Sequence, residues 1–141
     1  MSMEADQMPP ADIDAGPTLR THAMPRDANV NGDIFGGWVL SQMDLAGGAV
    51  ASRRARGRVA TVGIEAMKFH RPVLVGDEVS VYARVVRVGR TSIAVQIDTW
   101  ARRGRTSDAV KVTEGLFTFV AIGEDRRPRP VPPEDAGAPG A

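Results

Sequence analysis

The pattern of hydrophobic positions changes character once along the chain. From Ile34 to Val50 apolar residues occupy most positions and leave no wide polar face. A helix that is hydrophobic all round is a buried helix. From residue 58 onward apolar and polar residues alternate, which is the period of a β-strand. We therefore expect one buried helix and a set of strands that enclose it.

Local signals set the limits of these elements. Asn31 and Asp33 precede the helix and are residues that cap free amides, and Gly57 ends it. Three arginines near its end suit the negative pole of the helix and are interpreted as a solvated helix end: Arg53, Arg54 and Arg56. Short turns join the later strands, so they should pair antiparallel. The expected strands are 18–24, 58–67, 78–88, 92–102 and 111–122, which together with the helix give an α+β fold.

The 141 residues suit a single domain, expected over residues 18–130. Residues 1–17 should form a flexible arm and residues 131–141 a disordered proline-rich tail, because neither has a periodic apolar pattern. A net charge of +1 gives no reason to expect nucleic acid or membrane partners. The sequence has no cysteine, no long apolar run and no signal peptide, so we expect a cytoplasmic protein.

Asp44 is the one carboxylate in the middle of the apolar helix. A lone buried carboxylate is costly unless it is paired or hydrogen-bonded. Two interpretations stay open. Asp44 is either a structural carboxylate satisfied by neighbouring amides, or a general base or nucleophile made more basic by an apolar site.

Two further features near the helix start are candidates for catalysis. Gly36 and Gly37 would let a ligand approach the backbone, whose free N–H groups favour an oxyanion, although tight packing explains glycines equally well. Asn29 can orient water or a carbonyl group, and its alternative role is to form a turn. Ser41 has no histidine at the spacing of a catalytic triad, and two isolated histidines, His22 and His70, do not make a metal site.

The spacing of these candidates has a structural consequence. Gly36 and Asp44 are eight residues apart, which is about 12 Å along a helix. An oxyanion donor and a base must both lie within about 3 Å of the reacting atoms. One helix therefore cannot present both groups to one substrate, but two antiparallel helices can. The sequence thus predicts two equivalent sites at a twofold interface between subunits.

Several segments of the chain resemble the hotdog-fold acyl-CoA thioesterases, above all the YciA-like bacterial branch. The similarity covers roughly residues 18–130. It is carried by MPRDANVNGDIFGGW at residues 24–38, QMDLAGG at 42–48, FHRPV at 69–73, GRTS at 89–92 and TEGLF at 113–117.

This resemblance implies a hotdog fold, in which an antiparallel sheet wraps one central helix. It implies hydrolysis of acyl-CoA to a free acid and CoA, without metal or other cofactor, since CoA is part of the substrate. It also implies homodimers that assemble as trimers of dimers. Two alternatives are a hotdog protein that binds acyl-CoA as a sensor without hydrolysing it, and a hotdog dehydratase, for which the expected Asp and His pair is missing.

The resemblance also implies roles for individual residues. Asp44 would activate a water or attack the thioester directly, Asn29 would position water or carbonyl, and the amide of Gly37 or Gly36 would bind the oxyanion. His70 departs from the family pattern, where an apolar residue is frequent, so a role for it is in doubt. The expected substrate-binding residues are Trp38, Val39, Met43, Arg71, Arg90 and Thr91.

Overall fold

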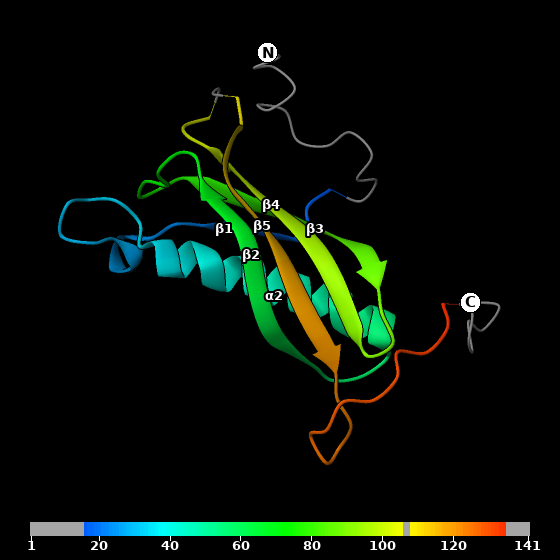
Figure 1. The fold of residues 1–141 in the computed structure, drawn as a ribbon. Helices are drawn as coiled ribbons and strands as arrows, with labels where there is room; N and C mark the ends of the chain where they lie inside the picture. The colour runs from blue at the N-terminus through cyan, green and yellow to red at the C-terminus, as the bar shows by residue number, and fades with distance from the viewer. Residues whose placement is uncertain (1–15, 106–107, 135–141) are drawn as a thin grey trace.

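One five-stranded antiparallel sheet and one long helix make up the fold of this chain (Figure 1). The computed structural model describes residues 16–105 and 108–134. The strands lie in the order β1-β3-β4-β5-β2 within the sheet. The elements are β1 (Leu19–His22), the short 3-10 helix η1 (Pro25–Asp27), α2 (Gly36–Ala55), β2 (Val59–Phe69), β3 (Glu78–Val88), β4 (Ser92–Arg102) and β5 (Val110–Ala121).

The start of α2 differs from the expectation. Neither Asn31 nor Asp33 caps the helix, because the N-cap residue is Phe35, which makes no side-chain capping bond. The polar loop ends two residues too early to reach the first turn. The helix consequently starts with Gly36 and Gly37 exposed and without a capping side chain.

The expectation that α2 is buried all round is wrong for the single chain. Its buried residues form one stripe: Val39, Met43, Ala46, Gly47, Ala51 and Ala55. On another side Leu45 is 63% exposed. The reason is that the sheet curves over only one side of the helix (Figure 1). The uncovered side is still apolar, which is what a surface that meets another subunit requires.

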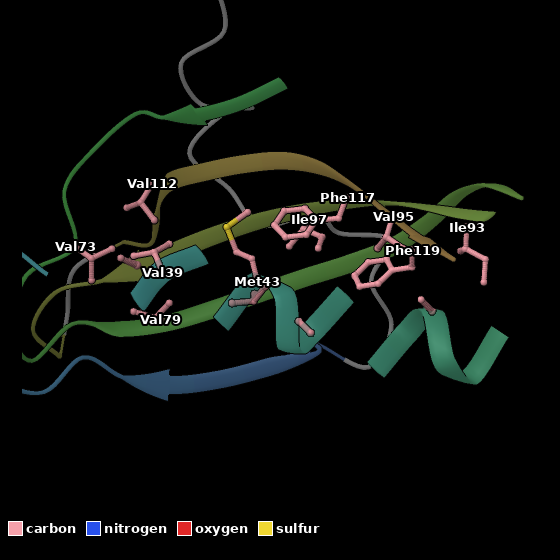
Figure 2. Close-up of a cluster of buried hydrophobic side chains, with 14 of the residues drawn as sticks. Val39, Met43, Val73, Val79, Ile93, Val95, Ile97, Val112, Phe117 and Phe119 are labelled. Carbon is pink, nitrogen blue, oxygen red and sulfur yellow. The ribbon is translucent and has the colours of Figure 1, made fainter. Parts of the chain in front are cut away.

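Close packing of α2 on the sheet depends on a glycine. A Cβ atom at Gly47 would lie 2.6 Å from Ile97 Cδ1 and 2.9 Å from Phe119 Cζ. The helix therefore approaches β4 and β5 as closely as a backbone without a side chain allows. Around this contact the core is made of apolar side chains from both layers, and Met43 reaches from the helix towards the strands (Figure 2).

The β2 strand lies at one edge of the sheet and pairs only with β5. Two of its apolar side chains are open to solvent, Val62 at 59% and Ile64 at 40% exposure. An exposed apolar edge strand is a template for pairing with another chain. The β2 edge of the sheet and the uncovered side of α2 are therefore both apolar surfaces suited to contact with another chain.

The segment after β5 returns to the end of α2. The Arg129 guanidinium donates to the carbonyl of Ala55, the last helical residue, at 2.9 Å. Further on, Val131 N–H donates to Arg90 O, and Arg54 donates to Pro132 O. The folded domain therefore extends through Pro132, beyond the boundary expected at residue 130. Residues 1–15 of the expected arm and 135–141 of the tail lie outside the described residues.

Candidate active site

Asp44 faces the edge strand β2, where it has a hydrogen-bond partner. The hydroxyl of Thr61 donates to Asp44 Oδ1 at 2.6 Å. The carboxylate is partly exposed, so the expected isolated burial is wrong, and its partner is a hydroxyl rather than a backbone amide. A single well-placed donor leaves the second carboxylate oxygen available to a ligand or a water.

A separate pocket of about 350 Å³ lies at the start of α2. It is formed where the loop before the helix meets the end of β2, the following loop and β5. Its lining is mixed, with an apolar floor and several polar groups. The lining residues are Asn29, Asp33, Ile34, Gly36, Val39, Phe69, His70, Arg71, Pro72, Val73 and Thr113.

Asn29 combines its two expected roles. Its side-chain oxygen accepts hydrogen bonds from the N–H groups of Asn31 at 2.8 Å and Asp33 at 3.2 Å, which makes it a turn former. The same side chain lines the pocket. Because the oxygen is used by the turn, the NH₂ group is the part that remains to donate to a ligand.

Gly36 and Gly37 keep their backbone N–H groups free of any acceptor among the described residues. Tight packing does not account for them. A Cβ atom at Gly37 would meet nothing within 4 Å, and one at Gly36 would make ordinary contact with the Phe69 ring at 3.6 Å. Two open amides at a helix N-terminus form an arrangement that binds an anion or a developing oxyanion.

Asp44 does not line the pocket that contains Gly36 and Asn29. Both glycines and Asp44 lie in the single helix α2, as the sequence predicted. Eight helical residues separate Gly36 from Asp44, which amounts to about 12 Å. One chain therefore holds these two groups at separate places along the helix.

The expected substrate-binding residues are divided by the fold. Val39 lines the pocket, whereas Met43 is completely buried in the core and does not line it, so a role for Met43 in substrate binding stays a prediction. Trp38 is partly buried against the core. Arg71 lines the pocket, and its guanidinium also donates to Lys111 O at 2.6 Å.

Arg90 and Thr91 lie far from this pocket along the fold, in the turn between β3 and β4. The Arg90 carbonyl accepts the Val131 N–H and the Thr91 carbonyl accepts the Ala121 N–H. This turn contacts the tail that caps the C-terminal end of α2. Neither residue can therefore act at the N-terminal end of the helix in its own chain.

Sequence reasoning gave no definite role to His70, which the structure places in the pocket wall. Its ring Nε2 lies 3.0 Å from Glu114 Oε1, and Lys111 Nζ lies 3.1 Å from the same oxygen. Burial by itself raises the pKa of the Glu114 carboxyl, but hydrogen bonds from His70 and Lys111 outweigh it and leave the pKa below its ordinary value. In the sequence, His70 stands out only as a polar residue two positions before Pro72.

An ion pair between the buried Asp77 and the half-exposed Arg103 holds the loop that supplies Pro72 and Val73 to the pocket. Asp77 is fully buried, and Arg103 donates to both of its oxygens at 3.0 Å. The hydrogen bond with Asp77 raises the pKa of Arg103 further, against the effect of burial. Asp77 also accepts the Leu74 N–H at 2.9 Å. These bonds fix the pocket wall.

The described residues contain no group of three or more His, Cys, Asp or Glu side chains arranged to hold a metal ion. They also contain no helix that is long and apolar enough to cross a membrane.

A long helix held in the curve of a five-stranded antiparallel sheet, with a carboxylate in mid-helix and open amides at its start, is the hotdog fold that the sequence suggested. Residues 31–107 match the family model described as the Thioesterase superfamily. The chain belongs to this superfamily.

Named relatives support the same assignment. An uncharacterized acyl-CoA thioester hydrolase of Zymomonas mobilis is 50% identical over 117 residues, which cover 83% of this chain and 78% of the relative. The acyl-CoA thioester hydrolase YciA of Escherichia coli is 49% identical over 119 residues, covering 82% and 90%. The resemblance to the YciA-like branch is thus confirmed.

Solved structures agree in fold. A hexameric broad-specificity acyl-coenzyme A thioesterase, in the form of an aspartate-to-alanine mutant, superposes with a TM-score of 0.81 at 43% identity, covering 86% of this chain and 89% of that one. A hexameric hotdog fold thioesterase of Campylobacter jejuni gives a TM-score of 0.81 at 39% identity, covering 89% and 97%.

Proposed function

We propose that this protein is an acyl-CoA thioesterase, which hydrolyses acyl-CoA thioesters to a free acid and CoA. The proposal rests on one observation. The same helix carries Asp44, whose carboxylate accepts a hydrogen bond from Thr61, and Gly36 and Gly37, whose backbone N–H groups are free. The relatives named as acyl-CoA thioester hydrolases support the same reaction. The pocket beside the amides supplies room for the acyl group.

The working unit in this proposal is a homodimer that pairs through β2. The exposed apolar side chains of β2 and of α2, Ile64, Val62 and Leu45, would be covered together. Antiparallel helices then bring Asp44 of one subunit to the Gly36 end of the other, so that two complete sites form. Three such dimers would make a hexamer, and the hexameric state of the structural neighbours supports this assembly.

In the proposed mechanism Asp44 accepts a proton from a water as the water oxygen bonds to the thioester carbonyl carbon. The carbonyl oxygen becomes an oxyanion and accepts hydrogen bonds from the partner subunit's Gly37 or Gly36 amide. The NH₂ group of Asn29 helps to position the water or the carbonyl. The C–S bond then breaks, and the CoA sulfur takes the proton from Asp44. Direct attack by Asp44, through an anhydride that water cleaves, is the alternative route.

No step of this mechanism requires a cofactor, and CoA enters only as part of the substrate. A CoA ester as substrate agrees with the cytoplasmic location that the sequence suggests. Nothing in the mechanism involves a nucleic acid or a membrane.

The test is a hydrolysis screen over acyl-CoAs from acetyl to palmitoyl, with thiol release as the readout. Asp44→Asn should lower kcat by about 10²- to 10⁴-fold, as the loss of a general base does. Asp125→Asn, in a turn outside the site, is the matched control and should keep full activity. Tight acyl-CoA binding by the wild-type protein without thiol release would instead favour the sensor alternative.

A further inference from the structure

The pocket at the start of α2 contains a hydroxyl group without a hydrogen-bond partner. Thr113, on β5, lines this pocket and is only 1% exposed. Its Oγ1 is enclosed and bonds to no other atom in the described part of the chain. A buried polar group without a partner costs free energy, and most such groups in native proteins are paired. The hydroxyl of Thr113 therefore points to a partner that the described residues do not supply.

Thr99 provides a comparison within the same sheet. It lies directly opposite Thr113 on β4, and its hydroxyl is also enclosed and without a partner, so the two hydroxyls do not bond each other. Thr99 is fully buried and does not line the pocket. Of these two unpaired hydroxyls, only the one on Thr113 belongs to a residue that a ligand in the pocket can reach.

His70 supplies a second unused polar atom in the pocket wall. Its Nε2 lies 3.0 Å from Glu114 Oε1. Although burial raises the pKa of Glu114, hydrogen bonds from His70 and Lys111 leave that pKa below its ordinary value, so at neutral pH the carboxylate is ionised and only accepts. The hydrogen between them therefore sits on Nε2. In the neutral ring Nδ1 is then an acceptor, and the described residues give it no donor.

The inner wall of the pocket is otherwise apolar. Ile34, Val39 and Val73 line it, and all three belong to the hydrophobic core, where Figure 2 labels Val39 and Val73. In such surroundings a hydrogen bond is stronger than in water, and a polar group without one is disfavoured. Threonine has staggered rotamers in which its hydroxyl and methyl groups exchange places. Thr113 can therefore turn its hydroxyl from the enclosed position towards a ligand.

We infer that this pocket selects short acyl groups that carry a hydroxyl, and that Thr113 and His70 determine the selectivity. The inference rests on the proposed thioesterase function, in which the Gly36 end of α2 holds the thioester carbonyl beside the pocket. A hydroxyl on the acyl chain can donate to His70 Nδ1 and accept from Thr113, whereas a keto group can only accept. The volume of about 350 Å³ is near the lower end for ligand pockets, roughly 300–1,000 Å³, which suits a short chain.

The substrate test compares four-carbon acyl-CoAs on the wild-type protein. For 3-hydroxybutyryl-CoA or 4-hydroxybutyryl-CoA, whichever places its hydroxyl at Thr113, kcat/KM should exceed that for butyryl-CoA by on the order of tenfold, as one or two added hydrogen bonds would produce. Acetoacetyl-CoA, which has a keto group and no hydroxyl, should gain less. Values for both hydroxybutyryl esters that are no higher than for butyryl-CoA would overturn the inference.

Thr113→Val replaces the hydroxyl by a methyl group of similar shape. It should bring the ratio of the hydroxybutyryl to the butyryl kcat/KM close to one. Because it removes a buried polar group without a partner, it should melt at or above the wild-type temperature. Thr99→Val is the matched control, with the same chemical change on the opposite strand and an unchanged ratio. Equal loss of the preference in both variants would show that packing of the sheet, and not the hydroxyl in the pocket, sets the ratio.

Two variants of His70 separate its ring nitrogens. His70→Gln can keep an N–H at the position of Nε2 and its bond to Glu114, but it lacks an acceptor at the position of Nδ1, so the ratio should fall. His70→Asn places an oxygen near the position of Nδ1 and should retain most of the preference, although it loses the bond to Glu114. The opposite order of the two variants would contradict the assigned role of Nδ1.

A binding measurement separates this inference from the proposed function. In calorimetry, Asp44→Asn protein should bind the preferred hydroxybutyryl-CoA on the order of tenfold more tightly than butyryl-CoA, and the added Thr113→Val change should remove the difference. If the difference is present but the wild-type protein hydrolyses no acyl-CoA, the thioesterase function is wrong and the selectivity of the pocket stands. If the wild-type protein hydrolyses acyl-CoAs but neither hydrolysis nor binding distinguishes the esters, the selectivity is wrong and the function stands.

Discussion

The hydroxyl of Thr61 donates a 2.6 Å hydrogen bond to Oδ1 of Asp44 and so links the edge strand β2 to the middle of α2. The bond fixes the carboxylate against the edge strand of the sheet. It also joins the proposed catalytic group to the strand through which the dimer is proposed to form. The position of the Asp44 carboxylate should therefore depend on how β2 is held in the dimer.

Loss of this bond should impair catalysis without unfolding the protein. Thr61→Val keeps the shape of the side chain but removes the donor, and it should lower kcat by on the order of tenfold, since hydrogen bonds to charged groups contribute roughly 1.5–3 kcal/mol. Thr61→Ser keeps the hydroxyl and should retain most of the activity. Steady-state kinetics with thermal melts provide the measurement. Full activity of the folded valine variant would show that Thr61 does not orient Asp44.

The shared site can be tested by complementation between inactive subunits. Asp44→Asn and Asn29→Ala should each impair hydrolysis. In a mixed dimer one site carries both changes and the other carries neither. Random mixing of equal amounts makes about half of the dimers mixed, so activity should recover to roughly a quarter of the wild-type value if the sites act independently.

Coexpression with two different affinity tags isolates the mixed dimer when subunits exchange slowly. Such a purified dimer should show about half of the wild-type activity. If it has only the residual activity of its parents, each site is contained in one subunit. The helix would then have to bend between Gly36 and Asp44, because eight straight helical residues span about 12 Å.

A charge on the exposed edge strand should prevent assembly. Ile64→Lys places an ammonium group on the apolar part of β2 and should shift the protein to monomers with little hydrolysis, because a buried unpaired charge is costly. Val86→Lys on β3 is the matched control, since Val86 is 43% exposed and Ile64 is 40% exposed. It should leave the β2-paired dimer intact. Light scattering measures the mass, and an active dimer of Ile64→Lys would disprove the pairing through β2.

The two adjacent glycines in the middle of α2 should respond in opposite ways to alanine. At Gly47 a Cβ atom would press into Ile97 and Phe119, so Gly47→Ala should lower the unfolding free energy by about 1–3 kcal/mol. At Gly48 the nearest atom, Phe119 Cε2, is 3.8 Å away. Gly48→Ala should therefore raise the unfolding free energy by up to about 1 kcal/mol, through better helix propensity. Urea titrations of both variants measure this, and similar shifts would show that the helix can move away from the sheet.

Glu114 should make stability depend on pH in the acid range. Its pKa is lower in the folded protein than the ordinary value of 4.5, because the bonds from His70 and Lys111 outweigh burial. The folded state then binds fewer protons, so the carboxylate's contribution is complete above about pH 4.5 and is lost as the pH falls through the lower folded pKa. The stability difference between wild type and Glu114→Gln should therefore shrink as the pH falls from 6 to 3. A difference independent of pH over that range would contradict the assigned pKa direction.

The sequence by itself determined the elements and the spacing within α2. Helical and strand periods are local properties, so the helix, the four later strands and their turns follow from the pattern of side chains. The eight-residue distance between Gly36 and Asp44 is equally local, and with it the argument for a site shared between two subunits. The resemblance in residues 24–48 and beyond then indicated the family, which the comparisons confirmed.

Only the tertiary structure decided which residues meet across long stretches of sequence. Thr61 as the partner of Asp44, His70 as part of the pocket wall, and Arg129 as the group at the end of α2 all depend on how far the sheet curves and where the chain returns. No period in the sequence encodes these contacts, because they join residues from separate elements. The same holds for exposure. The apolar helix surface at Leu45 looks buried in the sequence, whereas the sheet covers only the other side of the helix.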